Sequence, residues 1–523
     1  MICIGYDYGT TNSIVTQYVG TTEAPVKVLK KRTSSIQDGS TFVRSPKRLL
    51  SEVPMDEYRT TRYLYDYSYD ILLQALLSSP KTDSVFITAS VPNAYKDHQC
   101  KLMLDTIRQV GKRLFSDTQF NMHAVAIIPE PIAAALYYVV VEADKISPEG
   151  LVCICDIGGG TTDLAIVKYT ISGKDGHKNI AFRVLCTAPG DDSLGGDDID
   201  AVIASEICSR YELNPSMYSE QALIAACRAL KIQLSVRESA TVVLTGPDGK
   251  HPAKDENGRE MVILLTRKLL NALLEKHFIP KLSRQLEMLK DAFVTYVKDK
   301  YAEKGTRENA EYTLSQGVIL PIGGTSQIPR LQEIMKEHLK GELFLLPGER
   351  IDKAGIAPYD SVARGAAIYS AWINQELTDI DSIVLEGRTM HTISLEVNQG
   401  ELEVIVERNM PSEVYRPSRP LFPLMSESDG KTFRIKRIDL YEGEGRFVGD
   451  TRFGPAPQHL SSLAEKLENL NDPIYTHGRS LLDIPIDVQL KINEQGRLAS
   501  LSVTIPQGRV DHSDYYLNID FIK

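Results

Sequence analysis

The chain has 523 residues, of which 42% are hydrophobic and 24% charged, and its formal net charge at pH 7 is -10. This length is too great for one hydrophobic core, so we expect two or more domains. The acidic balance argues against a dedicated nucleic-acid binder, which is usually basic. No apolar run is long enough to span a bilayer. We therefore expect neither a nucleic-acid nor a membrane partner.

Targeting signals and cysteine usage predict a cytoplasmic location. Asp7 lies where a signal peptide would need its apolar segment, so we expect no secretory signal. The seven cysteines form no C-x-x-C pair, which predicts free thiols in a reducing compartment. Cys153 and Cys155 share one face of an apolar strand, which predicts core packing rather than a metal site.

Two similar hairpins open the two halves of the first 380 residues. Residues 2–6 read as a strand, 7–12 as a tight turn and 13–18 as a return strand. The pattern recurs in the ranges 151–155, 156–161 and 162–169. In each hairpin an aspartate precedes the turn, and glycine and threonine form its tip. Two such units, each followed by a long α/β region, predict two lobes of related fold.

Helical periodicity predicts the helices between and after these hairpins. The expected ranges are 99–114, 199–210, 219–234, 266–296, 328–339 and 360–373. Trp372, in the last of them, is expected in the core. The charged segment 295–313 is expected to be exposed. Tyrosines and arginines in 58–69 resemble a nucleic-acid stacking surface, but the acidic net charge favours a half-buried helix.

Strand patterns replace helices from about residue 389 onward. The expected strands are 392–397, 402–406, 432–440, 486–492 and 499–505, separated by turn signals and interrupted by one helical segment, 461–469. Residues 382–390 read as a linker with a short apolar run. The predicted domains are therefore 1–381, a linker 382–390 and an all-β domain 391–523.

The hairpin tips carry the chemistry. A glycine-rich turn exposes successive backbone N–H groups to phosphate oxygens, and glycine tolerates the positive φ that such turns need. An aspartate before the turn suits hydrated Mg2+, which binds few carboxylates. One such turn alone would equally suit a structural hairpin. Two of them, with Asp7 and Asp156, predict a clamp for a triphosphate and its metal; the P-loop pattern is absent.

A third glycine pair lies in the sequence Ile-Gly-Gly-Thr-Ser at 322–326, after an apolar strand. Small residues there would let a base and ribose lie against the backbone. A tight strand-to-helix turn would give the same pattern.

Together the three motifs resemble the two phosphate motifs and the adenosine motif of the actin, sugar-kinase and heat-shock ATPase superfamily. The stretches 127–136 (IIPEPIAAAL), 194–200 (LGGDDID) and 265–267 (LTR) resemble the seventy-kilodalton heat-shock, DnaK-like chaperones. The resemblance covers nearly all of 1–380 and continues more weakly into 488–496. It implies an actin-like α/β ATPase with two ribonuclease H-like lobes, followed by a β-sandwich that binds polypeptide or a protein partner. It also implies ATP or ADP with Mg2+, and leaves K+ open as a further ion.

Residue roles follow from the resemblance. Lys47 matches the catalytic lysine near the γ-phosphate, and Glu130 matches the glutamate that couples nucleotide to lobe closure. Asp156 would orient the attacking water beside Thr161, and Asp7 and Asp156 would hold the metal. The implied nucleotide contacts are Gly9, Thr10, Thr11, Asn12, Gly158, Gly159, Gly160, Asp163, Gly196, Lys231, Ser235, Gly323, Gly324, Thr325 and Gln327.

The adenosine end departs from the family's pattern. Arg228 replaces a glutamate three residues before Lys231, Gln327 replaces the arginine that stacks on adenine, and Tyr359 replaces an acidic residue. We therefore expect weaker nucleotide binding than is typical of the family.

Coupling residues depart as well. Pro92 of the interdomain relay is present, but Cys100 replaces its arginine, and Ala126 replaces the arginine that receives a J-domain. A standard J-domain co-chaperone is therefore not expected to act on this chain. The β-domain reaches residue 523 without the family's helical lid, so we expect a groove that exchanges ligand quickly.

Four functions remain open. The first is an atypical chaperone ATPase, which hydrolyses ATP slowly and controls the β-domain through the linker. The others are a small-molecule kinase of the same superfamily, an actin-like filament protein, and a nucleotide-dependent scaffold with little turnover. The appended β-domain argues against the kinase and the filament protein. Lys47 and Glu130 argue against the scaffold.

Overall fold

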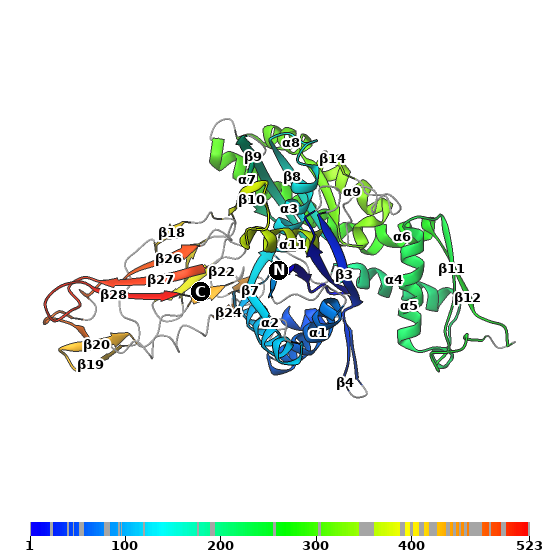
Figure 1. The fold of residues 1–523 in the computed structure, drawn as a ribbon, viewed down its shortest axis with the longest axis horizontal. Helices are drawn as coiled ribbons and strands as arrows, with labels where there is room; N and C mark the ends of the chain where they lie inside the picture. Colours follow the sequence, from blue (N-terminus) through cyan, green and yellow to red (C-terminus); the bar gives the residue numbers. More distant parts are fainter. Residues whose placement is uncertain are drawn as a thin grey trace. The chain divides into compact units, whose positions relative to one another are not determined.

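The computed structural model forms two compact units, Met1–Asn93 with Met103–Ile383 and Ala94–Leu102 with Val384–Lys523 (Figure 1). Each unit is described by itself. The structure describes residues 2–20, 25–38, 41–44, 46–51, 57–77, 84–92, 95, 97–118, 121–174, 177–188, 194–254, 258–301, 305–344, 360–386, 393–397, 401–406, 410, 413–417, 426–435, 440–442, 446–448, 451–453, 458–459, 473–480, 483–492 and 498–520.

The first unit begins with a five-stranded sheet, here called lobe 1, in the order β3-β2-β1-β6-β7. Its strands are β1 (Ile2–Asp7), β2 (Asn12–Tyr18), β3 (Val26–Thr33), β6 (Ser84–Val91) and β7 (Asn121–Pro129). The first three are antiparallel, and β6 and β7 run parallel to β1. Between β3 and β7 the chain also forms β4 (Ser35–Asp38), β5 (Thr41–Arg44), η1 (Pro46–Ser51), α1 (Glu57–Leu77) and α2 (Asp97–Thr118).

A six-stranded sheet, here called lobe 2, has the order β14-β13-β8-β9-β10-β15. Its strands are β8 (Glu149–Ile157), β9 (Thr162–Lys174), β10 (His177–Thr187), β13 (Val318–Ile322), β14 (Glu342–Leu343) and β15 (Ile380–Glu386). Again three strands are antiparallel, and two run parallel to the first of them. Lobe 2 thus repeats the strand order of lobe 1 and adds β15 at one edge, which explains why the two hairpins look alike in the sequence.

Two helices lie between the sheets, α3 (Glu130–Glu142) and α11 (Ser361–Ile373) (Figure 1). Both are buried along most of their length, because α11 packs on the strands of lobe 1 and α3 on those of lobe 2. They cross at Gly365, where a Cβ would overlap the carbonyl of Ala133. A glycine at this crossing brings the two helices together.

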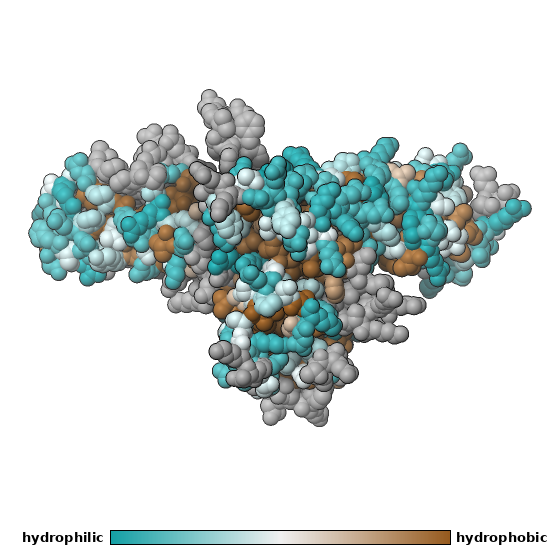
Figure 2. Space-filling model, turned by 90° about the horizontal axis from the view of Figure 1, so that it is seen from above, coloured by the Kyte–Doolittle hydropathy of each residue, from teal (hydrophilic) through white to brown (hydrophobic). Residues whose placement is uncertain are grey.

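The other helices of lobe 2 are α4 (Gly196–Arg210), η2 (Pro215–Met217), α5 (Glu220–Leu234), α6 (Arg267–His277), α7 (Ile279–Tyr301), α8 (Arg307–Ser315), η4 (Thr325–Gln327) and α9 (Pro329–Leu339). A two-stranded ribbon, β11 (Ser239–Val243) with β12 (Val262–Thr266), lies between α5 and α6 in the chain. Its outer face exposes Val243, Val262 and Leu264, and Figure 2 shows hydrophobic atoms among hydrophilic ones at that end of the molecule.

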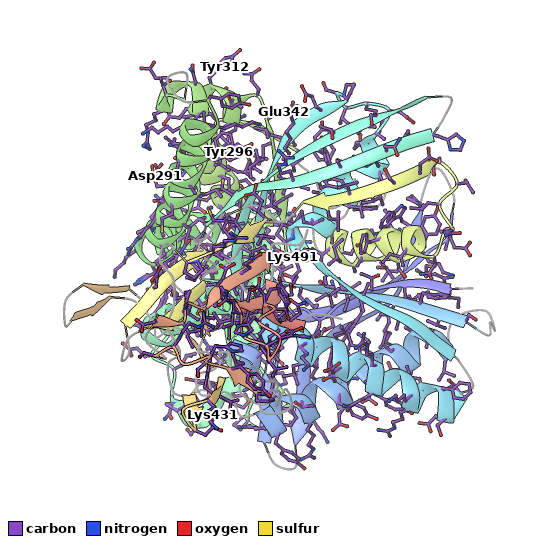
Figure 3. The ribbon with its side chains drawn as sticks, turned by 90° about the vertical axis from the view of Figure 1, so that its left-hand side faces the viewer. Asp291, Tyr296, Tyr312, Glu342, Lys431 and Lys491 are labelled. Carbon is purple, nitrogen blue, oxygen red and sulfur yellow. The ribbon has the colours of Figure 1, made fainter. Side chains whose placement is uncertain are left out.

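One helix prediction needs correction. The expected helix 266–296 is two helices that break at Phe278, because Pro280 lacks the N–H that a continuous helix would use. The prediction that the charged segment 295–313 is exposed is confirmed for most of its described residues. Within it α8 begins, Ala310 is buried, and Arg307 donates to Asp291 of α7 at 3.0 Å. Asp291 and Tyr312 are labelled in Figure 3.

The tyrosine-rich segment forms α1, and the prediction of a half-buried helix is confirmed. Tyr63 and Tyr67 are buried while Tyr58 is exposed. Arg113 of α2 stacks on Tyr69 with its guanidinium carbon 3.9 Å from the ring centroid. The ring of Tyr69 thus stacks on an arginine of the same chain. Trp372 is half-buried rather than in the core, and it stacks on Tyr369.

In the described residues of the second unit from Val384 onward, the named elements are strands. One sheet has the order β17-β16-β21-β24 and another β18-β26-β27-β28, with a three-stranded sheet β19-β20-β25 and the ribbon β22-β23. Their bounds are β16 (Ile393–Val397), β17 (Glu401–Val406), β18 (Val414–Tyr415), β19 (Ser426–Ser428), β20 (Thr432–Ile435), β21 (Leu440–Glu442), β22 (Arg446–Val448), β23 (Thr451–Phe453), β24 (Gln458–His459), β25 (Ile474–Tyr475), β26 (Asp487–Ile492), β27 (Leu498–Ile505) and β28 (Tyr515–Asp520).

One apolar core contains residues of β16, β17, β20, β21, β25, β26, β27 and β28, with Tyr415 of β18 packed against it. The expected single strand 432–440 is wrong, because β20 and β21 belong to different sheets. The expected helix 461–469 lies outside the described residues.

All seven cysteines are free thiols, as expected, and Cys153 and Cys155 are fully buried in the core of lobe 2. None of the helices in the described residues is long and apolar enough to cross a membrane.

Candidate nucleotide site

The two glycine-tipped turns meet in the structure. A Cβ on Gly159, in the second turn, would overlap the hydroxyl of Thr11 in the first. The second turn is closed by Gly158 N, which donates to Thr161 O at 3.0 Å. In the first turn, Ser34 donates its amide to Thr11 O at 2.8 Å and its hydroxyl to Gly9 O at 2.5 Å. Hydrogen bonds to backbone carbonyls therefore hold each of the two turns in place.

Thr11 offers an unsatisfied donor at this meeting point. Its Oγ1 is buried and has no hydrogen-bond partner among the described residues. A buried hydroxyl without a partner costs about 1–3 kcal/mol. A phosphate oxygen would supply the missing acceptor, so this atom and the glycine beside it fit a polyphosphate.

Lys47 and Glu130 form a buried ion pair beside the turns. Lys47 comes from η1 and Glu130 is the first residue of α3; Nζ donates to Oε1 at 2.8 Å, and the two residues are 6% and 5% exposed. Burial alone would lower the pKa of Lys47, but the carboxylates of Glu130 and Asp7 outweigh it and raise that pKa. The lysine is thus held as a cation at the head of α3.

Aspartates end the first strand of each lobe. Desolvation and the Glu130 carboxylate raise the pKa of Asp7 to about 7, although Ser90 donates to Asp7 Oδ1 at 3.1 Å. Desolvation, with Glu130 and Asp163 nearby, raises the pKa of Asp156 well above its ordinary value. Four carboxyl groups therefore lie around one ammonium, and an added cation would favour the ionised forms of Asp7 and Asp156.

The donor set fits hydrated Mg2+. No group of three or more His, Cys, Asp or Glu side chains in the part of the chain that the structure describes lies close enough to hold a metal ion directly. Mg2+ keeps several waters and is usually bound through one or two carboxylates plus substrate phosphates. Asp7 and Asp156 would be sufficient as protein ligands on those terms.

The third glycine pair lies against the second turn. Gly323 has φ +80, and a Cβ there would lie 2.5 Å from Ile157 O and 2.7 Å from Asp156 Oδ1, so the position requires glycine. Thr325 donates its hydroxyl to Gly158 O at 2.7 Å. A Cβ on Gly324 would meet nothing within 4 Å, which leaves open space on the protein side of that turn.

The start of α4 connects the second turn to α5. Gly196 N donates to Gly158 O at 3.0 Å and Asp197 N to Gly159 O at 2.6 Å, while Gly195 packs on Gly160. Lys231 donates to Gly196 O at 2.5 Å. The ranges 156–161, 194–200 and 322–327, far apart in the sequence, thus form one hydrogen-bonded group.

Other residues predicted for the site lie around this group without a direct role in it. Thr10 is buried, Asn12 begins β2, and Asp163 pairs in register with Asp156. Ser235 donates its hydroxyl back to Lys231 O at 3.2 Å at the end of α5. Gln327 is half-buried and donates to Ser326 Oγ at 3.2 Å. Tyr359 lies outside the described residues.

Sequence reasoning missed two members, Asp197 and Asp200. Both pair with cations from α5: Arg228 reaches Asp197 at 2.6 Å and Asp200 at 3.2 Å, and Lys231 reaches Asp200 at 2.7 Å. The available signal was the spacing, since residues three apart share one face of each helix.

Comparison with known proteins decides the family. The model of the Hsp70 protein family matches residues 82–450, more than half of the chain. The chain belongs to the Hsp70 family. Its first unit accordingly has the actin-like ATPase fold with two α/β lobes.

Individual relatives agree with this family. A chaperone protein HscA homolog of Haemophilus influenzae (strain PittGG) is 27% identical over 371 residues, 70% of this chain and 48% of that protein. A heat shock cognate HSP70 protein of Trypanosoma brucei brucei is 30% identical over 58% of this chain and 40% of its own length. The chaperone protein DnaK of Elusimicrobium minutum is 27% identical over 64% and 46%. This Hsp70-family chain spans about half the length of these curated relatives.

Proposed function

We propose that this chain binds Mg2+-ATP between the two glycine-tipped turns and hydrolyses it slowly to ADP and phosphate. The observation that carries the proposal is the contact between Gly159 and Thr11 beside the Lys47–Glu130 pair. This contact brings the two turns together at a buried hydroxyl without a hydrogen-bond partner among the described residues, and the nearby Lys47 interacts with Asp7 and Asp163, which supports the proposal. Phosphoryl transfer needs mainly such positioning and charge stabilisation.

The residues have separate roles in this proposal. Lys47 stabilises charge on the γ-phosphate, and Glu130 holds the lysine and connects it to α3. Asp156 orients the attacking water, with Thr161 beside the γ-phosphate. Asp7 and Asp156 hold hydrated Mg2+, which neutralises phosphate charge when bound; K+ is a further candidate ion. The amides and hydroxyls of 9–12, 158–160 and 323–325 bind the phosphates and nucleoside, with Lys231, Ser235 and Gln327 at the adenosine end.

We further propose that nucleotide state controls the β-domain, 391–523, through the linker 382–390, in a chaperone of the cytoplasm. The names of the relatives, which are those of chaperones and a heat-shock protein, support this reading. The first five residues of that linker, 382–386, lie in β15. The partner would be a polypeptide client or a specific protein, and a standard J-domain co-chaperone is not expected to stimulate turnover.

Titration calorimetry with ATP and ADP, with Mg2+ and with EDTA, tests the binding proposal. We expect a heat of association that depends on Mg2+, and slow release of phosphate from ATP. Limited proteolysis with and without ATP tests coupling, through nucleotide-dependent protection near residues 382–390. Absence of any heat with either nucleotide would overturn the proposal.

A kinase or scaffold of the same superfamily gives different results. A kinase would form ADP in proportion to an added small-molecule acceptor. A scaffold would bind ATP with little turnover. ATP-dependent pelleting would instead indicate a filament. The buried Lys47–Glu130 pair favours hydrolysis over the scaffold.

A further inference from the structure

The first of the two glycine-tipped turns is held by a serine that follows β3. Ser34 lies beside this turn because β2 and β3 pair in a register that sets Thr33 opposite Asn12. Its amide donates to Thr11 O at 2.8 Å and its hydroxyl to Gly9 O at 2.5 Å. One buried residue therefore contacts the turn at two points, once through its main chain and once through its side chain.

The hydrogen bonds of the Ser34 hydroxyl have a fixed direction. A serine hydroxyl has one hydrogen to donate, and in Ser34 that hydrogen goes to Gly9 O. The buried contact between Ser13 Oγ and Ser34 Oγ, 2.8 Å long, is therefore donated by Ser13. Ser34 thus accepts from β2 and donates to the turn, so two partners together set the orientation of its side chain.

Helix α1, which packs against β3, fixes the chain just before Ser34 (Figure 1). Tyr67 of α1 is buried and directs its hydroxyl to Arg32 O and Thr33 O at 3.1 Å each. Its ring also packs on Tyr8, with the two ring centroids 5.6 Å apart. Because the ring is buried and the hydroxyl is bonded, Tyr67 restricts movement at the end of β3.

We propose that Ser34 is a positioning residue for the phosphates of the nucleotide: its amide and hydroxyl fix the first turn, and Tyr67 fixes Ser34. The inference rests on the proposed ATP site. There the first turn contacts the phosphates and, through Asp7, the metal, whereas the nucleoside lies at the adenosine end. Backbone amides bind a phosphate oxygen only when several of them point at it. Loss of the Ser34 hydroxyl should therefore weaken ATP and ADP but not adenosine.

The test compares Ser34→Ala with Ser68→Ala in the full chain, by calorimetry with Mg2+-ATP and Mg2+-ADP. Ser68 is also a buried serine of lobe 1, and its hydroxyl bonds to Tyr6 OH at 3.0 Å. Each variant loses one buried hydrogen bond, so both should lower the unfolding temperature by a similar amount. In Ser34→Ala we expect both Kd values to rise about tenfold, because a smaller fraction of chains has a turn competent to bind. In Ser68→Ala both should stay at the wild-type value.

Adenosine separates positioning of the phosphates from a general loss of structure. Its Kd, measured by competition against ADP, should be the same in wild type and Ser34→Ala. Wild-type affinity for ADP in Ser34→Ala, an equal loss of affinity for adenosine, or an equal rise of Kd in Ser68→Ala overturns the inference.

A second variant keeps the inference testable if Ser34→Ala does not fold. Tyr67→Phe keeps the ring but lacks the hydroxyl that holds the carbonyls before Ser34, and should raise the Kd for ADP about threefold. Unchanged ADP affinity in Tyr67→Phe would then overturn the inference. A wild-type chain that binds no Mg2+-ATP would instead remove the proposed function, and this inference with it.

Discussion

At the phosphate end of the candidate site four carboxyl groups lie around one ammonium, whereas at the adenosine end two carboxylates face two cations. Asp7, Glu130, Asp156 and Asp163 surround Lys47, and Asp197 and Asp200 pair with Arg228 and Lys231. The adenosine end is balanced by protein groups alone. At the phosphate end the raised pKa values of Asp7 and Asp156 mean that these groups ionise fully at neutral pH only with an added cation, so dependence on metal, pH and nucleotide should be concentrated there.

We expect the largest effect from removing the ammonium group of Lys47 at the phosphate end. We expect Lys47→Met to keep Mg2+-ATP binding and to lower turnover by about 100- to 1,000-fold, the usual loss for one group that stabilises transition-state charge. It should also lower stability by about 3–5 kcal/mol, because Glu130 keeps its buried charge. Single-turnover hydrolysis and thermal unfolding measure the two effects.

Lys145→Met is the matched control. Lys145 pairs with Glu142 at the other end of the α3 region at 3.0 Å, but its side chain is 71% exposed. It should leave turnover unchanged. Normal turnover in Lys47→Met would remove this lysine from the mechanism.

Two glycine substitutions compare a tight contact with open space. Gly159 lies where the two turns meet, whereas a Cβ on Gly324 would meet no protein atom within 4 Å. In Gly159→Ala the new Cβ would overlap Thr11 Oγ1, so the turns must separate; we expect about 100-fold weaker ATP binding, the cost of misplacement by about 1 Å. Gly324→Ala meets no protein atom within 4 Å and should unfold at the wild-type temperature. If a nucleoside lies against that turn, Gly324→Ala should still weaken ADP binding. Equal binding by wild type and both variants would contradict a nucleotide between these turns.

The pH dependence of stability also tests the difference between the phosphate end and the adenosine end of the candidate site. Asp7 has a pKa of about 7 in the folded chain, against an ordinary value of 3.8. Between these values the folded chain binds more protons than the unfolded chain, so stability falls as pH rises from about 4 to about 7. Asp156, whose pKa is also raised by desolvation, adds to this fall. Asp7→Asn should remove the part of this slope that ends near pH 7.

The affinity for metal should change with pH in the opposite direction from stability. Mg2+ requires the ionised carboxylate, so the affinity for Mg2+-ATP should weaken by up to about tenfold per unit as pH falls below 7. Calorimetry in buffers of different ionisation enthalpy would detect the released proton. If the affinity for Mg2+-ATP depends on pH identically in the wild type and in Asp7→Asn, Asp7 is not the titrating group.

Local features of the site were predictable from sequence, and contacts between distant elements were not. The turns after Asp7 and Asp156 follow from glycine and threonine within six residues of chain, so strand, turn and aspartate were all found. The repeated hairpins also predicted the two lobes. The Lys47–Glu130 pair joins residues 83 apart, and only the family resemblance pointed to it.

The misses have physical reasons. Arg228 drew notice as a departure from the family, yet its partners Asp197 and Asp200 lie 31 and 28 residues away on another helix. Their spacing of three residues marks one face of that helix, but no local pattern pairs that face with Arg228. The break at Phe278 had a local signal, Pro280, but the hydrophobic period continues through it. For 432–440 the alternating pattern was real, while the change from one sheet to another depends on tertiary packing.

The smallest expected effect is at the adenosine end. Gln327 stands where the family places an arginine on adenine, and its side chain now contacts Ser326. Gln327→Arg would add one cation–π contact, worth about 0.5–1 kcal/mol, so ADP should bind about two- to fivefold more tightly with kcat unchanged. Gln316→Arg, at the end of α8, adds the same charge elsewhere and should change nothing. Equal tightening in both would mean general attraction of the nucleotide's charge. Tighter ADP binding in Gln327→Arg alone would mean that the adenosine end binds the base by stacking. It would also mean that glutamine at this position lowers the affinity for nucleotide.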